Sequence, residues 1–342
     1  MAHLTRRLVR LFAWSTQARL LGIAVIASST VAACSLPAFP PEGTTSTKTS
    51  TSTGTGNGSG ATTILATGQD SPTGIAIDGR SVYWTNMGTS YADGTVMTVP
   101  TGGGNPITLA SGQNNPQYVA VDGESAYWTN AVSPNGTVMT VPKGGGTPIT
   151  LALGQKGPFG IAVDATSVYW TTSDLVMTVP KGGGTPTTLA SGQNVPCDIT
   201  VDARSVYWTN QDDGTVMTVP TGGGTPITLA SGQNSPTGIA LDATSVYWTN
   251  ATSSTVMTVP KGGGTPSILA SGEGPGITID ATSVYWTNGV SPSGTVMMVP
   301  KGGGTPTTLA SDQNFPCGIA VDTASVYWTS VGSGTVVQLT QK

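Results

Sequence analysis

The side chains that could do chemistry in this sequence are carboxylates, hydroxyls and a few cysteines. Histidine, the usual proton carrier near neutral pH, occurs once in the 342 residues, at His3. His3 lies in an N-terminal segment with the pattern of a cleaved export signal. We therefore expect the processed chain to lack histidine catalysis, a histidine zinc site and a Ser-His-Asp triad.

Seven aspartates recur in one fixed sequence pattern. The pattern Asp-x-x-Ser occurs at Asp78–Ser81, Asp122–Ser125, Asp164–Ser167, Asp202–Ser205, Asp242–Ser245, Asp280–Ser283 and Asp322–Ser325. A ring of seven carboxylates could hold a cation, but the surrounding residues are alike in every copy. An aspartate at the first position of a tight turn accepts backbone N–H bonds. We therefore predict that these aspartates cap hairpin turns.

The most repeated stretch is Val82-Tyr83-Trp84-Thr85-Asn86. Its tryptophan returns at Trp128, Trp170, Trp208, Trp248, Trp286 and Trp328. Tryptophans could stack on sugars or bases, but seven equivalent copies in one context indicate packing between repeats. Methionines recur in the next predicted strand and are expected to be packing residues too: Met97, Met139, Met177, Met217, Met257 and Met297.

One repeat of about 40 residues holds four short runs of β-branched or aromatic residues, separated by turn residues. Four antiparallel strands per repeat is the layout of a β-propeller blade. We predict an all-β fold, a seven-bladed β-propeller of four-stranded antiparallel blades, over residues 62–342. The segment opens on a lone strand, 62–66, and ends on a third strand, 334–339. The N-terminal strand should complete the last blade and close the ring.

The motifs carry a family resemblance. Pro72-Thr73-Gly74-Ile75-Ala76-Ile77-Asp78 followed by Val82-Tyr83-Trp84-Thr85 resembles the YWTD propeller repeat of lipoprotein-receptor ectodomains. It is also similar to NHL-type propellers and to repeat lipoproteins of bacterial envelopes. The resemblance covers residues 62–342 and implies a propeller with a protein-binding role. The fourth motif residue is Asn, Thr or Ser here and never Asp, and the receptor domains have six blades where this chain has seven repeats.

The N-terminus predicts export. Residues 1–33 have a basic start, an apolar run and small residues before Cys34, as in a signal peptide. An ordinary secretory signal cleaved near Ala33 would fit, but Val31-Ala32-Ala33-Cys34 resembles a bacterial lipobox, which implies lipidation of Cys34. Ser35 after the cysteine favours the outer membrane of a Gram-negative bacterium. Residues 34–61 are rich in Ser, Thr and Gly and predict a flexible tether.

Loop lengths separate two ends of the predicted propeller. The Asp-x-x-Ser turns and the Gly-Gly-Gly turns share one end and keep their length, whereas the loops at the other end differ among repeats. One diversified end on a uniform scaffold predicts a binding face, although surface charge for solubility would also explain its acids. The candidates there are Tyr91, Asp93, Asp174, Asp212 and Asp213. Such a face could attract a basic partner or hold a hard cation.

A second set of candidates should ring the mouth of the central channel, where each innermost strand begins. They are Thr73, Gln117, Phe159, Cys197, Asp198, Thr237 and Cys317. A disulfide needs Cα atoms within about 7 Å. Cys197 and Cys317 belong to nearly opposite blades, so we predict two free thiols. They could be ligand contacts or simply small residues in a tolerant position.

Charge excludes one class of partner. Four of the thirteen basic residues precede residue 34 and no acid does, so the rest of the chain is more negative than the formal −4 of the whole. Nucleic-acid binding needs clustered Lys and Arg and is not expected.

Three functions are compatible with the sequence. We favour a non-enzymatic, lipid-anchored scaffold that binds a protein or a glycan through the variable acidic face, with no cofactor. The alternative is a calcium-dependent propeller enzyme, such as a lactonase or lyase, with its site at the channel. A purely structural spacer is the third.

Overall fold

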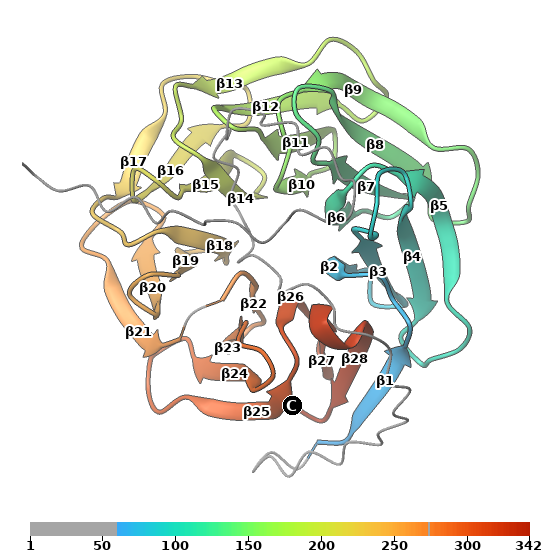
Figure 1. Cartoon of the computed structure of the whole chain (residues 1–342). Coiled ribbons are helices and arrows are strands. Elements are labelled where there is room, and N and C mark those ends of the chain that lie inside the picture. Colours follow the sequence, from blue (N-terminus) through green and yellow to red (C-terminus); the bar gives the residue numbers. More distant parts are fainter. Residues whose placement is uncertain (1–59, 273) are drawn as a thin grey trace, which may run out of the picture. The chain divides into compact units, whose positions relative to one another are not determined.

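The described part of the chain, residues 60–272 and 274–342 of a computed structural model, forms seven four-stranded antiparallel sheets arranged around an axis (Figure 1). In each sheet the first strand in sequence lies nearest the axis and the fourth lies at the rim, apart from the last blade. The prediction of a seven-bladed β-propeller is confirmed. The predictions made for residues 1–59 lie outside the described residues, and so does Glu273.

The strands fall into blades as follows. Blade 1 contains β2 (Pro72–Ile77), β3 (Ser81–Asn86), β4 (Gly94–Pro100) and β5 (Ile107–Gln113). Blade 2 contains β6 (Pro116–Val121), β7 (Ser125–Asn130), β8 (Gly136–Pro142) and β9 (Ile149–Gln155). Blade 3 contains β10 (Ile161–Val163), β11 (Ser167–Thr171), β12 (Leu175–Pro180) and β13 (Thr187–Ser191). Blade 4 contains β14 (Pro196–Val201), β15 (Ser205–Asn210), β16 (Thr215–Pro220) and β17 (Ile227–Ala230).

The remaining blades follow the same order. Blade 5 contains β18 (Pro236–Leu241), β19 (Ser245–Asn250), β20 (Thr255–Pro260) and β21 (Ser267–Ser271). Blade 6 contains β22 (Ile277–Ile279), β23 (Ser283–Asn288), β24 (Gly294–Pro300) and β25 (Thr307–Gln313). Blade 7 contains β26 (Pro316–Val321), β27 (Ser325–Ser330), β28 (Thr335–Thr340) and, at its rim, β1 (Thr62–Ala66).

The pairing of β1 with β28 closes the ring. The register runs from Thr62 opposite Leu339 to Ala66 opposite Val336, with an irregularity between Ile64 and Ala66. The outer edge of β28 is therefore covered by the start of the propeller segment, as predicted from the two incomplete ends of the sequence.

The hairpin turns follow from the Asp-x-x-Ser pattern. In blade 1 the Asp78 Oδ1 atom accepts the backbone N–H groups of Arg80 and Ser81, and Oδ2 accepts the Tyr83 hydroxyl at 2.9 Å. The same bonds recur in the other blades, so these aspartates cap turns as predicted. The Gly-Gly-Gly turn between the third and fourth strands needs positive φ at Gly103 (85°) and Gly104 (137°), which glycine adopts without steric cost.

The core lies between blades. The seven motif tryptophans are fully buried, and Trp170 of blade 3 packs against Tyr127, Val138 and Leu151 of blade 2. Equivalent clusters fill the other blade interfaces. The methionines of the third strands lie in or beside these clusters. The tryptophans are therefore packing residues, as predicted.

The motif threonine, on the second strand of each blade, ties its blade to the start of the innermost strand of the next blade. Thr85 Oγ1 donates to the Gln117 carbonyl oxygen at 2.6 Å, and Thr129 Oγ1 donates to that of Phe159 at 2.6 Å. The series continues through Thr171, Thr209, Thr249 and Thr287, and Thr329 of blade 7 donates back to Thr73 of blade 1. Each interface between described blades thus contains one of these buried hydrogen bonds.

The asparagine at the fourth motif position also has a structural reason. Asn86 Nδ2 donates to Gln69 Oε1 at 2.9 Å and to Thr95 Oγ1 at 3.0 Å, while Trp84 Nε1 donates to the same Gln69 oxygen. Aspartate has no N–H donor and could not make these bonds. In blades 1, 2, 4 and 5 the departure from the YWTD pattern is therefore matched by a glutamine that precedes the strand pair.

Helix is nearly absent from the described residues, which contain one 3₁₀ turn, Val331–Ser333. No helix in this part of the chain has the length and hydropathy needed to span a membrane.

Candidate functional site

Two faces of the ring differ in their charges. We call the end with the Asp-x-x-Ser and Gly-Gly-Gly turns the uniform face. There, a lysine of one blade reaches the turn aspartate of the preceding blade. Within the described residues this occurs five times: Lys143–Asp78 (2.6 Å), Lys181–Asp122 (2.7 Å), Lys261–Asp202 (2.7 Å), Lys301–Asp242 (2.9 Å) and Lys342–Asp280 (2.8 Å).

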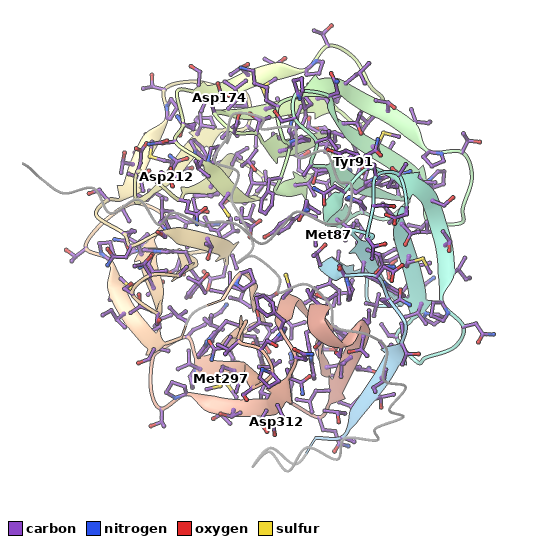
Figure 2. All side chains as sticks on the ribbon, in the orientation of Figure 1. Met87, Tyr91, Asp174, Asp212, Met297 and Asp312 are labelled. Carbon is purple, nitrogen blue, oxygen red and sulfur yellow. The ribbon has the colours of Figure 1, made fainter. Side chains whose placement is uncertain are left out.

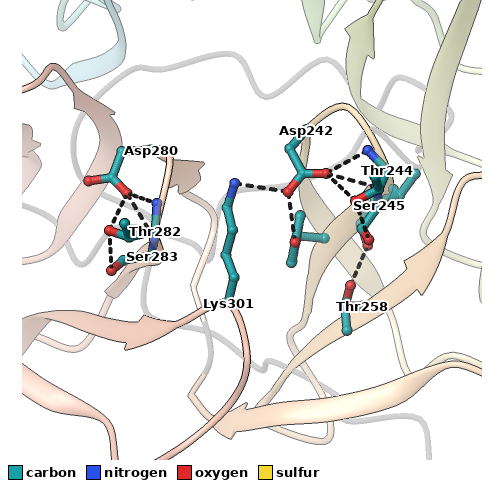
Figure 3. A network of polar contacts seen from close by, with 10 residues as sticks. Asp242, Thr244, Ser245, Thr258, Asp280, Thr282, Ser283 and Lys301 are labelled. Carbon is teal, nitrogen blue, oxygen red and sulfur yellow. Dashed lines mark hydrogen bonds and ion pairs between the residues drawn. The ribbon is translucent and has the colours of Figure 1, made fainter.

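Figure 3 shows one of these bridges, in which Lys301 of blade 6 contacts the Asp242 carboxylate that caps the blade 5 turn at Thr244 and Ser245. Each lysine Nζ also lies 5.0–6.0 Å from the centroid of a tyrosine ring. Partial burial opposes ionisation of Asp78, but the bonds from Lys143 and from two backbone N–H groups outweigh it and lower the pKa to about 2. The lysines of the uniform face therefore hold blades together.

Two interfaces differ from this rule. Blade 1 has Thr101 and blade 4 has Thr221 where the other GGG turns carry lysine. Among the described residues, Asp322 of blade 7 and Asp164 of blade 3 consequently make no ion pair with the following blade.

The opposite end, which we call the variable face, combines the loops between second and third strands with the loops between blades. Backbone hydrogen bonds join the two kinds of loop: Gly88 N donates to Asp70 O, and Asp212 N donates to Asn194 O. Its described charged residues are six aspartates and one lysine: Asp70, Asp93, Asp174, Asp212, Asp213, Asp312 and Lys156. Figure 2 shows Tyr91, Asp174, Asp212 and Asp312 spread around the ring.

The predicted residues of the variable face have unlike surroundings. Tyr91 is 82% exposed at the tip of the longest loop. Asp93 is exposed, but its Oδ2 atom accepts the backbone N–H and hydroxyl groups of Thr89 and Ser90, so it shapes its own loop.

The other predicted acids of the variable face accept fewer hydrogen bonds than Asp93 and are more available to a partner. Asp213 accepts one bond from Asn194, and Asp174 is half-buried with a bond from Ser173. Asp212 is exposed, and no hydrogen bond to its carboxylate is found within the described residues.

The third location is a cavity of about 150 Å³ on the axis. Its wall comes from the innermost strands of blades 1, 2, 4, 6 and 7. Its polar side chains are Thr73, Tyr118, Asp198 and Cys317, and its apolar side chains are Ile75, Pro275, Ile277 and Ile319.

The channel-mouth candidates divide between this cavity and the blade interfaces. Thr73, Asp198 and Cys317 line the cavity. Gln117 is buried and donates to Asn115 Oδ1 and Met87 Sδ. Phe159 packs against Tyr118, with ring centroids 5.0 Å apart, and Thr237 bonds to Thr249.

The prediction of free thiols is confirmed for Cys317. This residue is a free, buried thiol, and burial raises its pKa to about 12. Cys197 and Cys317 are not bonded to each other, in agreement with their places in different blades.

Tyr118 was not among the candidates predicted from the sequence. It stands out when the seven repeats are compared at one further position. The residue just before the first Ile or Val of the innermost strand is glycine in five blades: Gly74, Gly160, Gly238, Gly276 and Gly318. A Cβ atom on Gly160 would lie 2.6 Å from the Cys197 carbonyl oxygen, so glycine permits the close approach of adjacent innermost strands. Blades 2 and 4 have Tyr118 and Asp198 at this position, so the side chains around the axis differ from blade to blade.

Asp198 is held by backbone donors. Its Oδ1 accepts the N–H of Ile199 at 2.9 Å, and its Oδ2 accepts the N–H of Ile239 in blade 5 at 3.0 Å. Burial raises the pKa of Asp198 to about 7, although both backbone bonds act in the opposite direction. Burial also raises the pKa of Tyr118, and the charges of Asp198 and Cys317 raise it further. The three groups therefore share one electrostatic environment.

Within the described residues, no group of three or more His, Cys, Asp or Glu side chains is placed to bind a metal ion. The axial cavity contributes one described carboxylate, and the acids of the variable face are spread over several loops.

The chain matches no described protein family and no curated protein. Solved structures resemble it in fold. A streptogramin B lyase matches with a TM-score of 0.70 at 13% identity, over 83% of this chain and 98% of the lyase. The RRP9 WD40 repeats match with a TM-score of 0.68 at 11% identity, over 82% of this chain and 97% of theirs.

A chain of a nidogen/laminin complex has 20% identity and a TM-score of 0.52, over 64% of this chain and 89% of that one. At these identities the likenesses support the β-propeller fold and no shared activity.

Proposed function

We propose that this protein is a non-enzymatic, membrane-anchored propeller scaffold that binds a basic protein partner, or alternatively a glycan, through the variable face. The observation that carries the proposal is the unequal use of charge on the two faces. On the uniform face, five lysines are paired with turn aspartates among the described residues. On the variable face, the described residues contribute six aspartates against Lys156.

Unpaired charge of one sign attracts an oppositely charged partner and speeds its association. The loops that carry these aspartates differ from blade to blade, whereas the scaffold below them repeats. Tyr91 adds an exposed aromatic side chain of the kind that often anchors an interface.

The test is capture of partners from a cell-envelope extract by the full-length chain. A variant with Asp70, Asp212 and Asp312 changed to Lys reverses charge on the variable face while leaving the Asp93 loop intact. A matched control, Glu124→Lys, makes the same kind of change on the uniform face. We expect a partner that the wild-type chain and the control retain, that the variant loses, and that elutes as salt is raised. Equal retention by all three chains would contradict the proposal.

The alternative function, a calcium-dependent enzyme at the channel, is favoured by one observation. The blades contribute different side chains to the axial cavity, and Asp198 is the carboxylate that the described residues place there. Titration of the full-length chain with Ca²⁺ by calorimetry is its test. Binding that disappears in Asp198→Asn would support a metal at the axis, and no heat at millimolar Ca²⁺ would remove this alternative.

The anchor is part of the proposal. It rests on the lipobox-like residues before Cys34 and on the tether of residues 34–61. Labelling of cells with a radioactive fatty acid should mark the wild-type chain and should not mark Cys34→Ala. Labelling of both chains would place any lipid elsewhere.

A further inference from the structure

Two side chains of the axial cavity depart from the residue that most repeats have at the same position. Five blades have glycine just before the first Ile or Val of the innermost strand. A Cβ atom on these glycines would collide with the neighbouring innermost strand. Tyr118 and Asp198 are the two described exceptions, and both line the cavity. A carboxylate and a phenol thus stand in a wall whose other side chains are Thr73, Cys317 and the apolar Ile75, Pro275, Ile277 and Ile319.

The carboxylate has acceptor capacity left over. Each Asp198 oxygen accepts one backbone N–H and has a further lone pair. No lysine or arginine forms an ion pair with Asp198 within the described residues. A carboxylate in an apolar site without a counter-ion is unfavourable, and a bound cation would relieve that cost.

The surroundings suit an organic cation better than a hard metal ion. Ca²⁺ takes six to eight oxygen ligands, whereas the side chains of this wall offer one carboxylate and the hydroxyls of Thr73 and Tyr118 beside aliphatic and aromatic carbon. Tyrosine rings attract ammonium groups, and a cavity of about 150 Å³ accommodates a molecule of roughly benzene size. We propose that the axial cavity binds a small organic ammonium ion, with Asp198 as its counter-ion and the Tyr118 ring beside its ammonium group.

Among the described residues, the group that makes the site respond to pH is Asp198. The other titratable groups that face the cavity in this part of the chain are Tyr118 and Cys317, and burial raises the pKa of both further above the physiological range. An ammonium ion binds the ionised carboxylate, and the pKa of Asp198 in the ligand-free protein is raised to about 7 by burial. The affinity should therefore fall about tenfold per pH unit below that value.

The experiment is calorimetric titration of the full-length chain with benzylammonium chloride at pH 8 and pH 6. Benzyl alcohol, which has the same shape without the charge, is the matched probe. We expect benzylammonium to bind at pH 8, to bind several-fold to tenfold more weakly at pH 6, and to bind at least tenfold more weakly to Asp198→Asn. Glu124→Gln, a change of the same kind on the uniform face, should leave the affinity unchanged.

Three outcomes would overturn the proposal. They are equal affinity for benzylammonium and benzyl alcohol, equal affinity of wild type and Asp198→Asn, or no benzylammonium binding at millimolar concentration. Thermal unfolding of Asp198→Asn and its benzyl alcohol affinity show whether the variant retains the cavity. Tyr118→Leu should weaken benzylammonium binding independently of Asp198. None of these readouts depends on the partner proposed for the variable face.

Discussion

Thr129 shows how one hydroxyl contributes to the ring. Its side chain is fully buried, and Oγ1 donates to the Phe159 carbonyl oxygen of the next blade. Thr129→Val keeps the shape but leaves that carbonyl without this donor. We expect a loss of about 1–3 kcal/mol in the free energy of unfolding. Urea denaturation measures the loss, and Thr187→Val, at an exposed position of β13, should change stability by less than about 0.5 kcal/mol. Equal effects would show that the buried bond contributes nothing.

Asp198 makes stability depend on pH in an unusual direction. Its folded-state pKa, raised by burial to about 7, lies above the unfolded value, so the folded state prefers the protonated carboxyl. This group therefore destabilises the fold increasingly as pH rises from about 4 to 7. Asp198→Asn should be more stable than wild type at pH 8, by about 2–4 kcal/mol, with the difference disappearing near pH 4. Thermal unfolding across this range checks the trend, and a constant difference would contradict it.

Some residue roles were readable from the sequence and others were not. Identical context in seven copies identified the turn aspartates and the packing tryptophans. The bonds of Asn86 were not predicted because its partner Gln69 lies in a loop, 17 residues away, whose path a sequence does not give. Tyr118 was missed because its position is defined by the glycines of the other blades and by the backbone they approach.

At the scale of the element, two blade interfaces lack the lysine bridge. Thr221 of blade 4 stands where lysine would reach Asp164 of blade 3, whose pKa is still lowered by backbone and hydroxyl bonds. Thr221→Lys should form the missing pair and raise stability by about 0.5–1 kcal/mol, or about 1–3 °C in Tm.

A matched change separates charge from added carbon in that experiment. Thr221→Met adds a chain of similar length without charge and should give a smaller gain. The lysine gain should shrink in 1 M NaCl and as pH falls through the lowered pKa of Asp164. A gain that is the same in both variants would assign it to the aliphatic stem.

The elements themselves were predictable because strands and turns are determined locally. Period-two patterns, Asp-x-x-Ser and Gly-Gly-Gly fix where each strand begins and ends. The use of the lysines was not predictable from one blade, since each bridge joins residues about 60 positions apart. The structure shows these lysines as links between blades.

At the scale of the whole molecule, closure by β1 has a direct test. Leu65 of β1 is buried in the cluster between blades 7 and 1, as Leu229 is between blades 4 and 5. Leu65→Ala and Leu229→Ala should each cost about 2–5 kcal/mol of unfolding free energy and should agree within about 1 kcal/mol. Urea denaturation measures both. A much smaller cost at Leu65 would mean that the ring is not held closed by β1.

The meeting of the two ends also has a consequence for biosynthesis. Thr340 donates to the Ala61 carbonyl oxygen across 279 positions of sequence, so the ribosome makes one strand of blade 7 long before the other three. Until the last strand emerges, β1 has no partner and the interface of blade 1 with blade 7 stays open. Contacts of such separation form late in folding. Resistance to proteolysis is thus a property that only full-length chains acquire, and a chain cut short near its C-terminus is left open to degradation.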